Sequence, residues 1–255
     1  MISQSDIVTR LDIERGDTLL IGSDVLQLAL NMREAGLAFQ AHLFIDDVLT
    51  RLGDRGTLLF PAFNFDFCQG ATFDIRSSPT AMGSLSRAAL KRPDFQRTQH
   101  PLHSFAVKGR HATELCGLAN VSSFGAGSPF EFLHDHDGKM LIIGLPLQGA
   151  FTYAHYVEER EGVDYRYMKE FRGKYIDGDG RETERLYSLY VRDLERGVVS
   201  DLHPLESKLL EEGILATQMI NGVRFSQLQL SDSYSTIVKD IRDNSGRSLY
   251  RLEPN

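Results

Sequence analysis

Compact apolar runs alternate with helical patterns over the first 60 residues. The runs Thr18–Ile21 and Gly56–Phe60 predict buried strands. Between them, Val25–Glu34 and Ala41–Leu52 carry apolar residues at helical spacing, and each pattern closes near a glycine. A strand, two helices and a strand form a crossover unit, which is typical of parallel pairing. The pattern therefore predicts an α/β fold with a mixed, largely parallel central sheet flanked by helices.

The pattern changes after residue 161. Tyr165–Ile176 and Glu184–Val191 predict two strands, and the Asp-Gly-Asp-Gly segment between them is a strong hairpin signal. A shorter hairpin is predicted across Asn221-Gly222, with a helix on either side: Leu202–Glu212 and Ser231–Asp243. We therefore expect a single domain over residues 1–255. An α/β core over 1–161 would interlock with an antiparallel α+β section over 162–255.

The composition is that of an ordinary globular protein, with 42% hydrophobic and 25% charged residues among 255. A formal net charge of −7 argues against a broad surface for nucleic acid or anionic membrane. No apolar run approaches the ~20 residues that a membrane helix needs. Neither cysteine belongs to a CxxC motif, and the N-terminus resembles no signal peptide. We expect a cytoplasmic protein without nucleic-acid or membrane partners. A homodimer stays open.

The segment Thr152–Glu159 carries the strongest candidate chemistry. It follows the apolar run Met140–Gly144 and a loop with proline and glycine. On a helix, His155 and Glu158 would share one face. A carboxylate in that position holds an imidazole in one tautomer and raises its basicity, as a general base requires. Spacing alone favours a solvated helix face, so the other motifs must decide between the two interpretations.

Two further candidate sites are weaker. The segment His134–Asp137 offers an HxH pair, but no third ligand at a recognisable spacing accompanies it, which favours a polar loop and no metal site. Cys68 lies in a phenylalanine-rich loop without a local histidine to activate it, which favours a buried apolar role. HExxH, GxSxG, P-loop and dinucleotide-binding motifs are absent from the sequence.

Six segments resemble, in order and at similar distances, the motifs of one family. They are Gly56–Phe63, Phe73–Gly83, Arg97–Ser104, Gly127–Pro129, Gly138–Gly144 and Thr152–Glu158. Together they resemble the aminoglycoside 3-N-acetyltransferase family, over roughly residues 15–170 and only loosely beyond. The resemblance implies a mixed sheet with flanking helices and an antiparallel subdomain. It also implies an enzyme that transfers an acetyl group from acetyl-CoA to a primary amine of an amino sugar.

The resemblance assigns roles to individual residues. His155 would be the general base, Glu158 the acid that orients it, and Thr152 the family's threonine at the start of that helix. As our own mechanistic hypothesis, Thr152 donates to the tetrahedral oxyanion. Five residues fall in segments expected to face the coenzyme: Ser23, Arg97, His100, Ser104 and Ser128. Three more are expected to bind the ammonium or hydroxyl groups of the acceptor: Asn64, Asp66 and Glu159.

The chain also departs from the family, which bears on the acceptor. Gly22–Val25 replaces the usual HSSL segment, and Phe63–Cys68 is closer to members found among bacterial surface-polysaccharide genes. These departures predict an amino sugar carried on a nucleotide, for surface polysaccharide. The alternatives are an aminoglycoside antibiotic 3-N-acetyltransferase, or O-acyl transfer to a sugar hydroxyl. A non-catalytic ligand-binding protein on the same fold is a further class.

Overall fold

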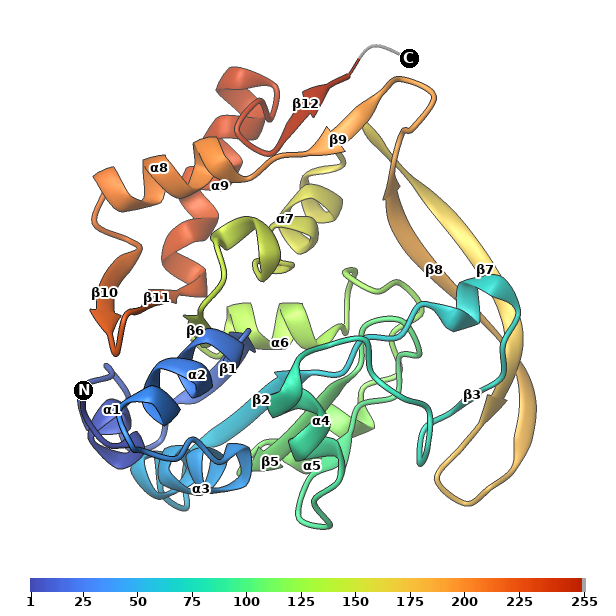
Figure 1. Cartoon of the computed structure of the whole chain (residues 1–255). Helices are drawn as coiled ribbons and strands as arrows, with labels where there is room; N and C mark the ends of the chain where they lie inside the picture. The colour runs from blue at the N-terminus through green and yellow to red at the C-terminus, as the bar shows by residue number, and fades with distance from the viewer. Residues whose placement is uncertain (254–255) are drawn as a thin grey trace.

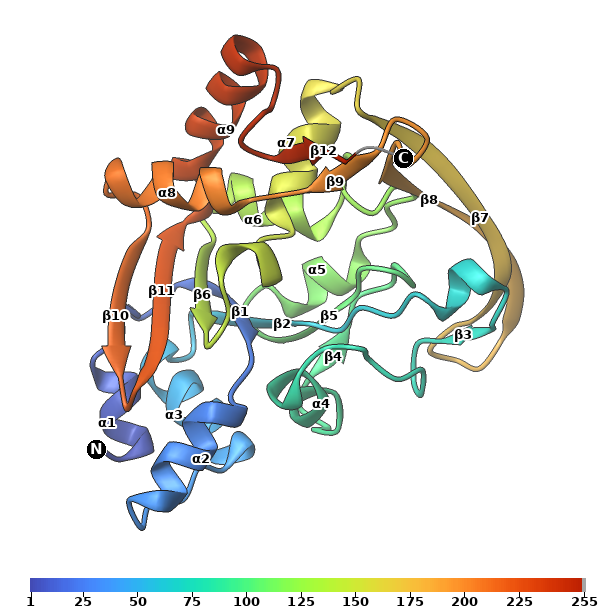
Figure 2. The same ribbon diagram turned by 45° about the horizontal axis from the view of Figure 1, so that its top comes forward.

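A seven-stranded mixed sheet forms the centre of the molecule, in the order β10-β11-β6-β1-β2-β5-β4 (Figures 1 and 2). The computed structural model describes residues 1–253. The strands are β1 (Thr18–Ser23), β2 (Thr57–Pro61), β4 (Gln96–Arg97), β5 (Phe105–Gly109), β6 (Lys139–Ile143), β10 (Ala216–Ile220) and β11 (Val223–Gln229). Both apolar runs expected to be strands in the first 60 residues are therefore strands, and they pair in parallel through β1 and β2.

The mixed α/β fold is confirmed, but its parallel part is smaller than expected. Only β6, β1 and β2 pair in parallel, and every other neighbour in this sheet is antiparallel. The difference has two causes. The connection from β2 to β5 does not bring the chain back to the end of the sheet at which β2 begins, so β5 runs antiparallel to β2. The hairpin β10–β11 adds two further antiparallel pairs at the free edge of β6.

Successive residues of the central strands face two separate cores, as a sheet covered on both sides requires. Leu58 and Phe60 of β2 face one core, and Leu59 between them faces the other. The helices of the first core are α1 (Gln4–Thr9), α2 (Leu26–Glu34), α3 (Ala41–Leu52) and α4 (Ser84–Leu90). Those of the second are α5 (Ala112–Gly117), α6 (Pro129–Asp135), α7 (Tyr153–Glu161), α8 (His203–Glu211) and α9 (Leu230–Asn244).

A long hairpin extends along one side of the molecule (Figure 1). Its strands β7 (Arg166–Ile176) and β8 (Glu182–Arg192) pair along their whole length, and β3 (Phe73–Asp74) joins β7 in parallel. The predicted Asp-Gly turn closes the hairpin, with Gly180 at a φ of +84°. Two short strands, β9 (Val198–Ser200) and β12 (Tyr250–Leu252), pair near its base. β11, which follows residue 161, pairs with β6, which precedes it. The division of the domain at residue 161 stays a prediction.

The segment His134–Asp137 is only partly the polar loop that was expected. Ser128 caps the start of α6 by accepting a hydrogen bond from the Glu131 amide, and the helix runs on to Asp135. Among the described residues, no group of three or more His, Cys, Asp or Glu is placed to hold a metal ion.

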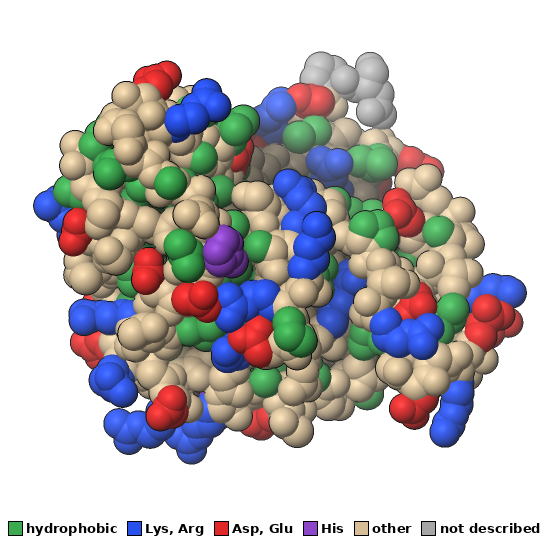
Figure 3. Space-filling view, turned by 60° about the horizontal axis from the view of Figure 1, so that its bottom comes forward, with side chains coloured by type: hydrophobic (Ala, Val, Ile, Leu, Met, Phe, Trp, Pro, Cys, Tyr) green, Lys and Arg blue, Asp and Glu red, His purple; other side chains and the backbone are tan. Residues whose placement is uncertain are grey.

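No helix within residues 1–253 is both long and apolar enough to cross a membrane. Figure 3 shows acidic and basic side chains interspersed over one face.

Candidate active site

His155 and Glu158 form a dyad on α7, in which Glu158 is buried and His155 is partly exposed. His155 Nδ1 lies 2.6 Å from Glu158 Oε2, and the Glu158 side chain is 0% exposed. Two residues at the start of the β7–β8 hairpin hold the same carboxylate. The Tyr165 hydroxyl donates to Oε1 at 3.0 Å, and Arg166 Nε lies 2.8 Å from Oε2. The i, i+3 spacing on the helix therefore brings the pair together, and the hairpin base fixes its acid.

The contacts decide which nitrogen of His155 carries the proton. Arg166 Nη2 lies 3.0 Å from His155 Nδ1. A guanidinium can only donate, so a hydrogen bond between them would require Nδ1 to be unprotonated. A carboxylate oxygen at 2.6 Å needs the opposite, an Nδ1–H that donates to it. The shorter, charge-assisted contact prevails, and Arg166 Nη2 donates instead to Ser200 Oγ at 3.1 Å. Nε2 of His155 is then left with a lone pair, as a base requires.

The surroundings keep His155 neutral and Glu158 ionised. Burial and the Arg166 guanidinium lower the pKa of His155, against the opposing effect of Glu158. Burial alone would raise the pKa of Glu158, but Arg166, His155 and the Tyr165 hydroxyl hold that pKa below its ordinary value. A neutral imidazole oriented by an ionised carboxylate is the arrangement that general-base catalysis uses.

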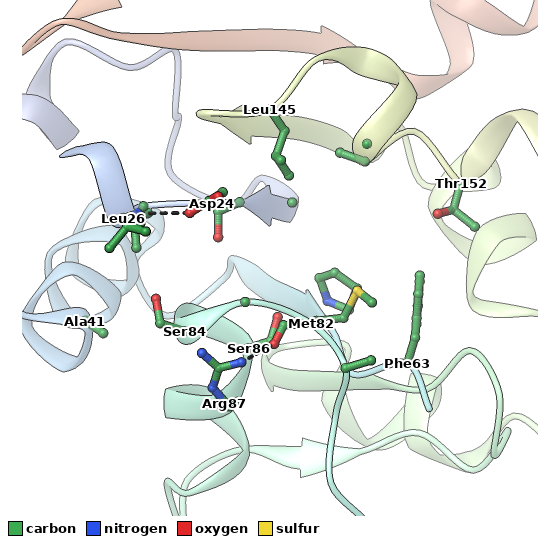
Figure 4. A pocket seen from close by; sticks show the side chains of 18 of the residues that line it. Asp24, Leu26, Ala41, Phe63, Met82, Ser84, Ser86, Arg87, Leu145 and Thr152 are labelled. Carbon is green, nitrogen blue, oxygen red and sulfur yellow. Dashed lines mark hydrogen bonds between the residues drawn. The ribbon is translucent and has the colours of Figure 1, made fainter. Parts of the chain in front are cut away.

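His155 lies in the wall of a cavity of about 890 Å³, at the carboxyl ends of the three parallel strands. Ligands of open α/β sheets bind at such ends. Gly22–Asp24 closes β1, Pro61 ends β2, and the segment after β6 contributes Leu145 and Ala150. In Figure 4, Thr152 lies at the opposite side of the cavity from Leu26 and Ala41. The volume is in the range typical of small-molecule and cofactor sites.

Comparison with known proteins identifies the family. The model of the aminoglycoside 3-N-acetyltransferase family matches residues 35–240. The chain belongs to this family. A curated relative, aminoglycoside N(3)-acetyltransferase III of Serratia marcescens, is 32% identical over 112 residues. That match covers 43% of this chain and 41% of the relative, so the chain spans well under two thirds of that relative's length.

Several solved structures, aminoglycoside acetyltransferases among them, share the fold at low identity. Aminoglycoside acetyltransferase AAC(3)-Xa superposes with a TM-score of 0.80 at 20% identity, covering 96% of this chain and 94% of that one. A structure described as AAC-IIIb binary with CoASH gives 0.78 at 17%, covering 93% and 95%. YokD from Bacillus subtilis gives 0.78 at 16%, covering 96% and 95%. The expected fold of the aminoglycoside 3-N-acetyltransferase family is thus confirmed.

Three of the residues predicted for the site line one cavity: Ser23, Thr152 and His155. Glu158 lies directly behind His155. Thr152 occupies the N-cap position of α7, but its side chain makes no capping hydrogen bond. The hydroxyl is therefore available to a bound ligand, and its role as an oxyanion donor stays a prediction.

The other residues expected to face the coenzyme do not line this cavity. The Arg97 guanidinium donates to Ser104 Oγ and to the carbonyls of Ala62 and Ser78. His100 is buried, and its Nδ1 accepts from two backbone amides. Ser104 donates to the Ala62 carbonyl, and Ser128 caps α6. These polar groups are satisfied inside the protein, so the structure gives them a supporting role, and coenzyme contact stays a prediction for them.

The three residues predicted to bind the acceptor also lie outside the cavity wall. Asn64 is buried and closes a local turn, where its Oδ1 accepts from the Asp66 amide at 2.9 Å. Asp66 is exposed at the start of a 3₁₀ helix. Glu159 is half-buried and accepts from Ser122 Oγ at 2.8 Å, and burial raises the pKa of its carboxyl. Asn64 and Asp66 contact each other, and Glu159 is held separately on α7 by Ser122, so the role of all three in acceptor binding stays a prediction.

The sequence did not predict two residues that the structure brings to the site. Arg166 and Tyr165 hold Glu158 from the base of the hairpin. The Arg97–Ser104 segment, with its two histidines, was a candidate pocket lining, and of these two histidines His103 lines the cavity although no role was assigned to it. No local pattern signals the contacts of Tyr165 and Arg166, because they depend on how the hairpin packs against α7.

Proposed function

We propose that this protein transfers the acetyl group of acetyl-CoA to a primary amine of an amino sugar, and that aminoglycosides are the acceptor class to test first. Membership of the aminoglycoside 3-N-acetyltransferase family supports the reaction. The observation that carries the proposal is the His155–Glu158 dyad, whose Nε2 is free to accept a proton in the wall of an 890 Å³ cavity.

The proposed reaction begins with a neutral amine, because an ammonium has no lone pair with which to attack. As the nitrogen bonds to the acetyl carbonyl carbon, His155 Nε2 accepts a proton from that nitrogen. The bond between carbon and sulfur then breaks, and the proton passes from His155 to the CoA sulfur. The products are the N-acetylated amine and CoA with a free thiol. Glu158 keeps its charge throughout and stabilises the transient imidazolium.

The cavity residues suit an acyl-CoA donor. The wall that leads to His155 is mostly apolar, with Val25, Phe63 and Met82 among its side chains, which fits the pantetheine arm. Arg87 is the one Lys or Arg that lines this cavity among the described residues, and it lies at the α4 end. Its guanidinium would hold a phosphate of CoA, since Arg recognises such oxyanions with several N–H groups.

The names of the relatives support an aminoglycoside acceptor over a nucleotide-linked one. The match in Serratia marcescens is an aminoglycoside acetyltransferase, and structures of AAC-VIa with sisomicin and of AAC(3)-IVa with apramycin carry aminoglycosides. None of the comparisons supports the surface-polysaccharide role. Nucleotide-linked amino sugars and sugar hydroxyls belong in the same panel, because the proposed chemistry serves any nucleophile that presents a proton to His155.

The proposal is tested by following thiol release from acetyl-CoA with aminoglycosides, nucleotide-linked amino sugars and amine-free sugars. We expect release with at least one amine, and a kcat about 10²–10⁴-fold lower for His155→Ala. Glu161→Gln is the matched control, because Glu161 lies on the same helix and pairs with Arg242 away from the dyad. Release without dependence on His155, or no release with any amine, would rule the proposed function out.

A further inference from the structure

His103 is a buried histidine that borders the same cavity as His155. It is 5% exposed, and phenylalanine rings surround it. Its centroid lies 4.6 Å from that of Phe63, 4.7 Å from that of Phe124 and 5.3 Å from that of Phe65. Phe124 in turn lies 5.5 Å from the His155 ring. A polar ring has therefore been placed in an apolar wall next to the proposed base.

The two nitrogens of His103 differ in their surroundings. Nδ1 is buried without a hydrogen-bond partner. Nε2 also has no partner among the described residues, yet it is not among the buried unpartnered atoms. Because the residue lines the cavity, the accessible edge of the ring is the one that carries Nε2. Leaving a polar ring nitrogen free is costly in an apolar wall, so a ligand group is expected to meet it.

The unpartnered Nδ1 indicates the tautomer. Buried N–H groups without an acceptor are rarer than acceptors without a donor, so the proton belongs on Nε2. Burial, together with the neighbouring imidazoles of His100 and His155, keeps the pKa of His103 well below its ordinary value. At neutral pH the ring is then an uncharged donor whose N–H faces the cavity. A neutral imidazole serves as an electrophile of this kind in other enzymes.

We propose that His103 Nε2–H donates a hydrogen bond to the carbonyl oxygen of the acetyl thioester. This inference rests on the proposed function. His155 must meet the proton of the attacking amine, so the carbonyl carbon lies within reach of the cavity wall that both histidines share. When the new bond to nitrogen forms, the carbonyl oxygen gains a negative charge, which it loses when the bond to sulfur breaks. His103 keeps its proton throughout and stabilises that charge, beside the Thr152 hydroxyl.

A donor fixed by packing suits this role. The three phenylalanine rings hold the imidazole in one orientation, so little reorganisation is needed as the charge develops. Its neutrality also matters. A cationic ring at this position would repel a positively charged acceptor, and it would raise the cost of the imidazolium that forms at His155.

His103→Phe tests the inference, because it keeps a flat ring in the aromatic wall and removes both nitrogens. We expect kcat for thiol release to fall roughly 10²–10³-fold, as for the loss of one oxyanion donor. The KM for acetyl-CoA and the affinity for CoA should stay unchanged. The thermal midpoint should stay equal or rise, since an unpartnered buried nitrogen is lost. His103→Gln, which returns an N–H near the Nε2 position, should recover part of the rate.

His111→Phe is the matched control, since His111 precedes α5, does not line the cavity and should tolerate the change. Wild-type turnover by His103→Phe would overturn the inference. So would a fall in rate that comes with an equal loss of CoA affinity or of thermal stability, because that result assigns His103 to packing.

A measurement on the wild-type protein separates this inference from the proposed function. Spectra of protein with ¹⁵N-labelled histidine report which ring nitrogen carries the proton, whether or not any acceptor turns over. We expect His103 to be neutral with its proton on Nε2 at neutral pH, and its Nε2–H signal to shift with acetyl-CoA more than with CoA. A proton on Nδ1 would refute the inference even in an active enzyme. Absence of turnover by the wild type would refute the proposed function alone.

Discussion

Glu158→Gln replaces a buried carboxylate by an amide of the same shape. The carboxylate accepts Nδ1–H of His155 and the hydroxyl of Tyr165, and it lies against the guanidinium of Arg166. An amide offers one oxygen and one NH₂ group to the same neighbours. Because His155 Nδ1–H and Arg166 both donate at the Oε2 position, the amide oxygen belongs there, and the NH₂ group then faces the Tyr165 hydroxyl, which can accept. The proton stays on Nδ1, but a neutral amide no longer stabilises the positive charge that His155 gains when it accepts a proton.

The size of the effect follows from these contacts. A base whose protonated form has lost its charged partner is weakened, so we expect kcat to fall by up to the ~10²–10⁴-fold that a general base contributes. Arg166 is also left as a buried cation without its carboxylate. Removing one partner of a buried ion pair costs about 3–5 kcal/mol. For a chain of this length that cost lowers the midpoint of thermal unfolding by about 6–20 °C.

The assay measures thiol release and thermal unfolding on the same preparations of wild type, Glu158→Gln and Glu161→Gln. Rates are compared at saturating acetyl-CoA, so that they report kcat. Glu161 pairs with Arg242 at the end of α7, and its variant should match wild type in both measurements. A Glu158→Gln protein with wild-type turnover would refute the role of the carboxylate charge in stabilising the imidazolium of His155. Lost turnover with an unchanged midpoint would refute the account of the buried ion pair.

Three further predictions concern pH and stability. Because Arg166 helps to lower the pKa of His155, Arg166→Met should raise that pKa and move the acid limb of a pH profile of kcat/KM to higher pH; an unmoved limb contradicts this. Although burial would raise the pKa of Asp240, its contacts with Asn244, Lys208 and Ser248 lower it below the ordinary value. Asp240→Asn should therefore lose about 2–3 kcal/mol in urea unfolding at pH 7. That loss should shrink as pH falls through and below the folded pKa, and an equal loss at all pH values would refute it. Gly144→Ala adds a methyl group at a φ of +69°, 2.1 Å from the Asp24 carbonyl, so it should cost on the order of 3 kcal/mol and weaken CoA binding in titrations.

The helices and central strands could be predicted because each carries its own signal. The run from Thr18 and the run to Phe60 are apolar on both faces, and both are strands in the structure. The pairing of β5 with β2 and of β11 with β6 was not predictable in this way. Which strands pair at the edges of a sheet depends on which distant segments pack together. The hydrophobic pattern of a strand does not indicate the strand with which it pairs.

The residues of the candidate site also differ in how far the sequence could predict their role. His155 and Glu158 were predictable because three residues along a helix already bring their side chains together. Arg97, His100 and Ser104 were equally prominent as polar residues, yet the structure uses their polar groups for internal hydrogen bonds. A pattern of polar residues does not distinguish a cavity wall from a buried network. Only the packing of the segments around Ala62 and the cavity decides between them.

The central sheet has a consequence for how the protein is made. β6 leaves the ribosome well before β11, which covers its edge and begins 80 residues after β6 ends. During synthesis the nascent chain therefore presents an apolar strand with an open edge, a state prone to aggregate. A chain that stops before residue 223 keeps both His155 and Glu158 but cannot cover that edge. Such truncated products should accumulate as insoluble material rather than as a smaller enzyme.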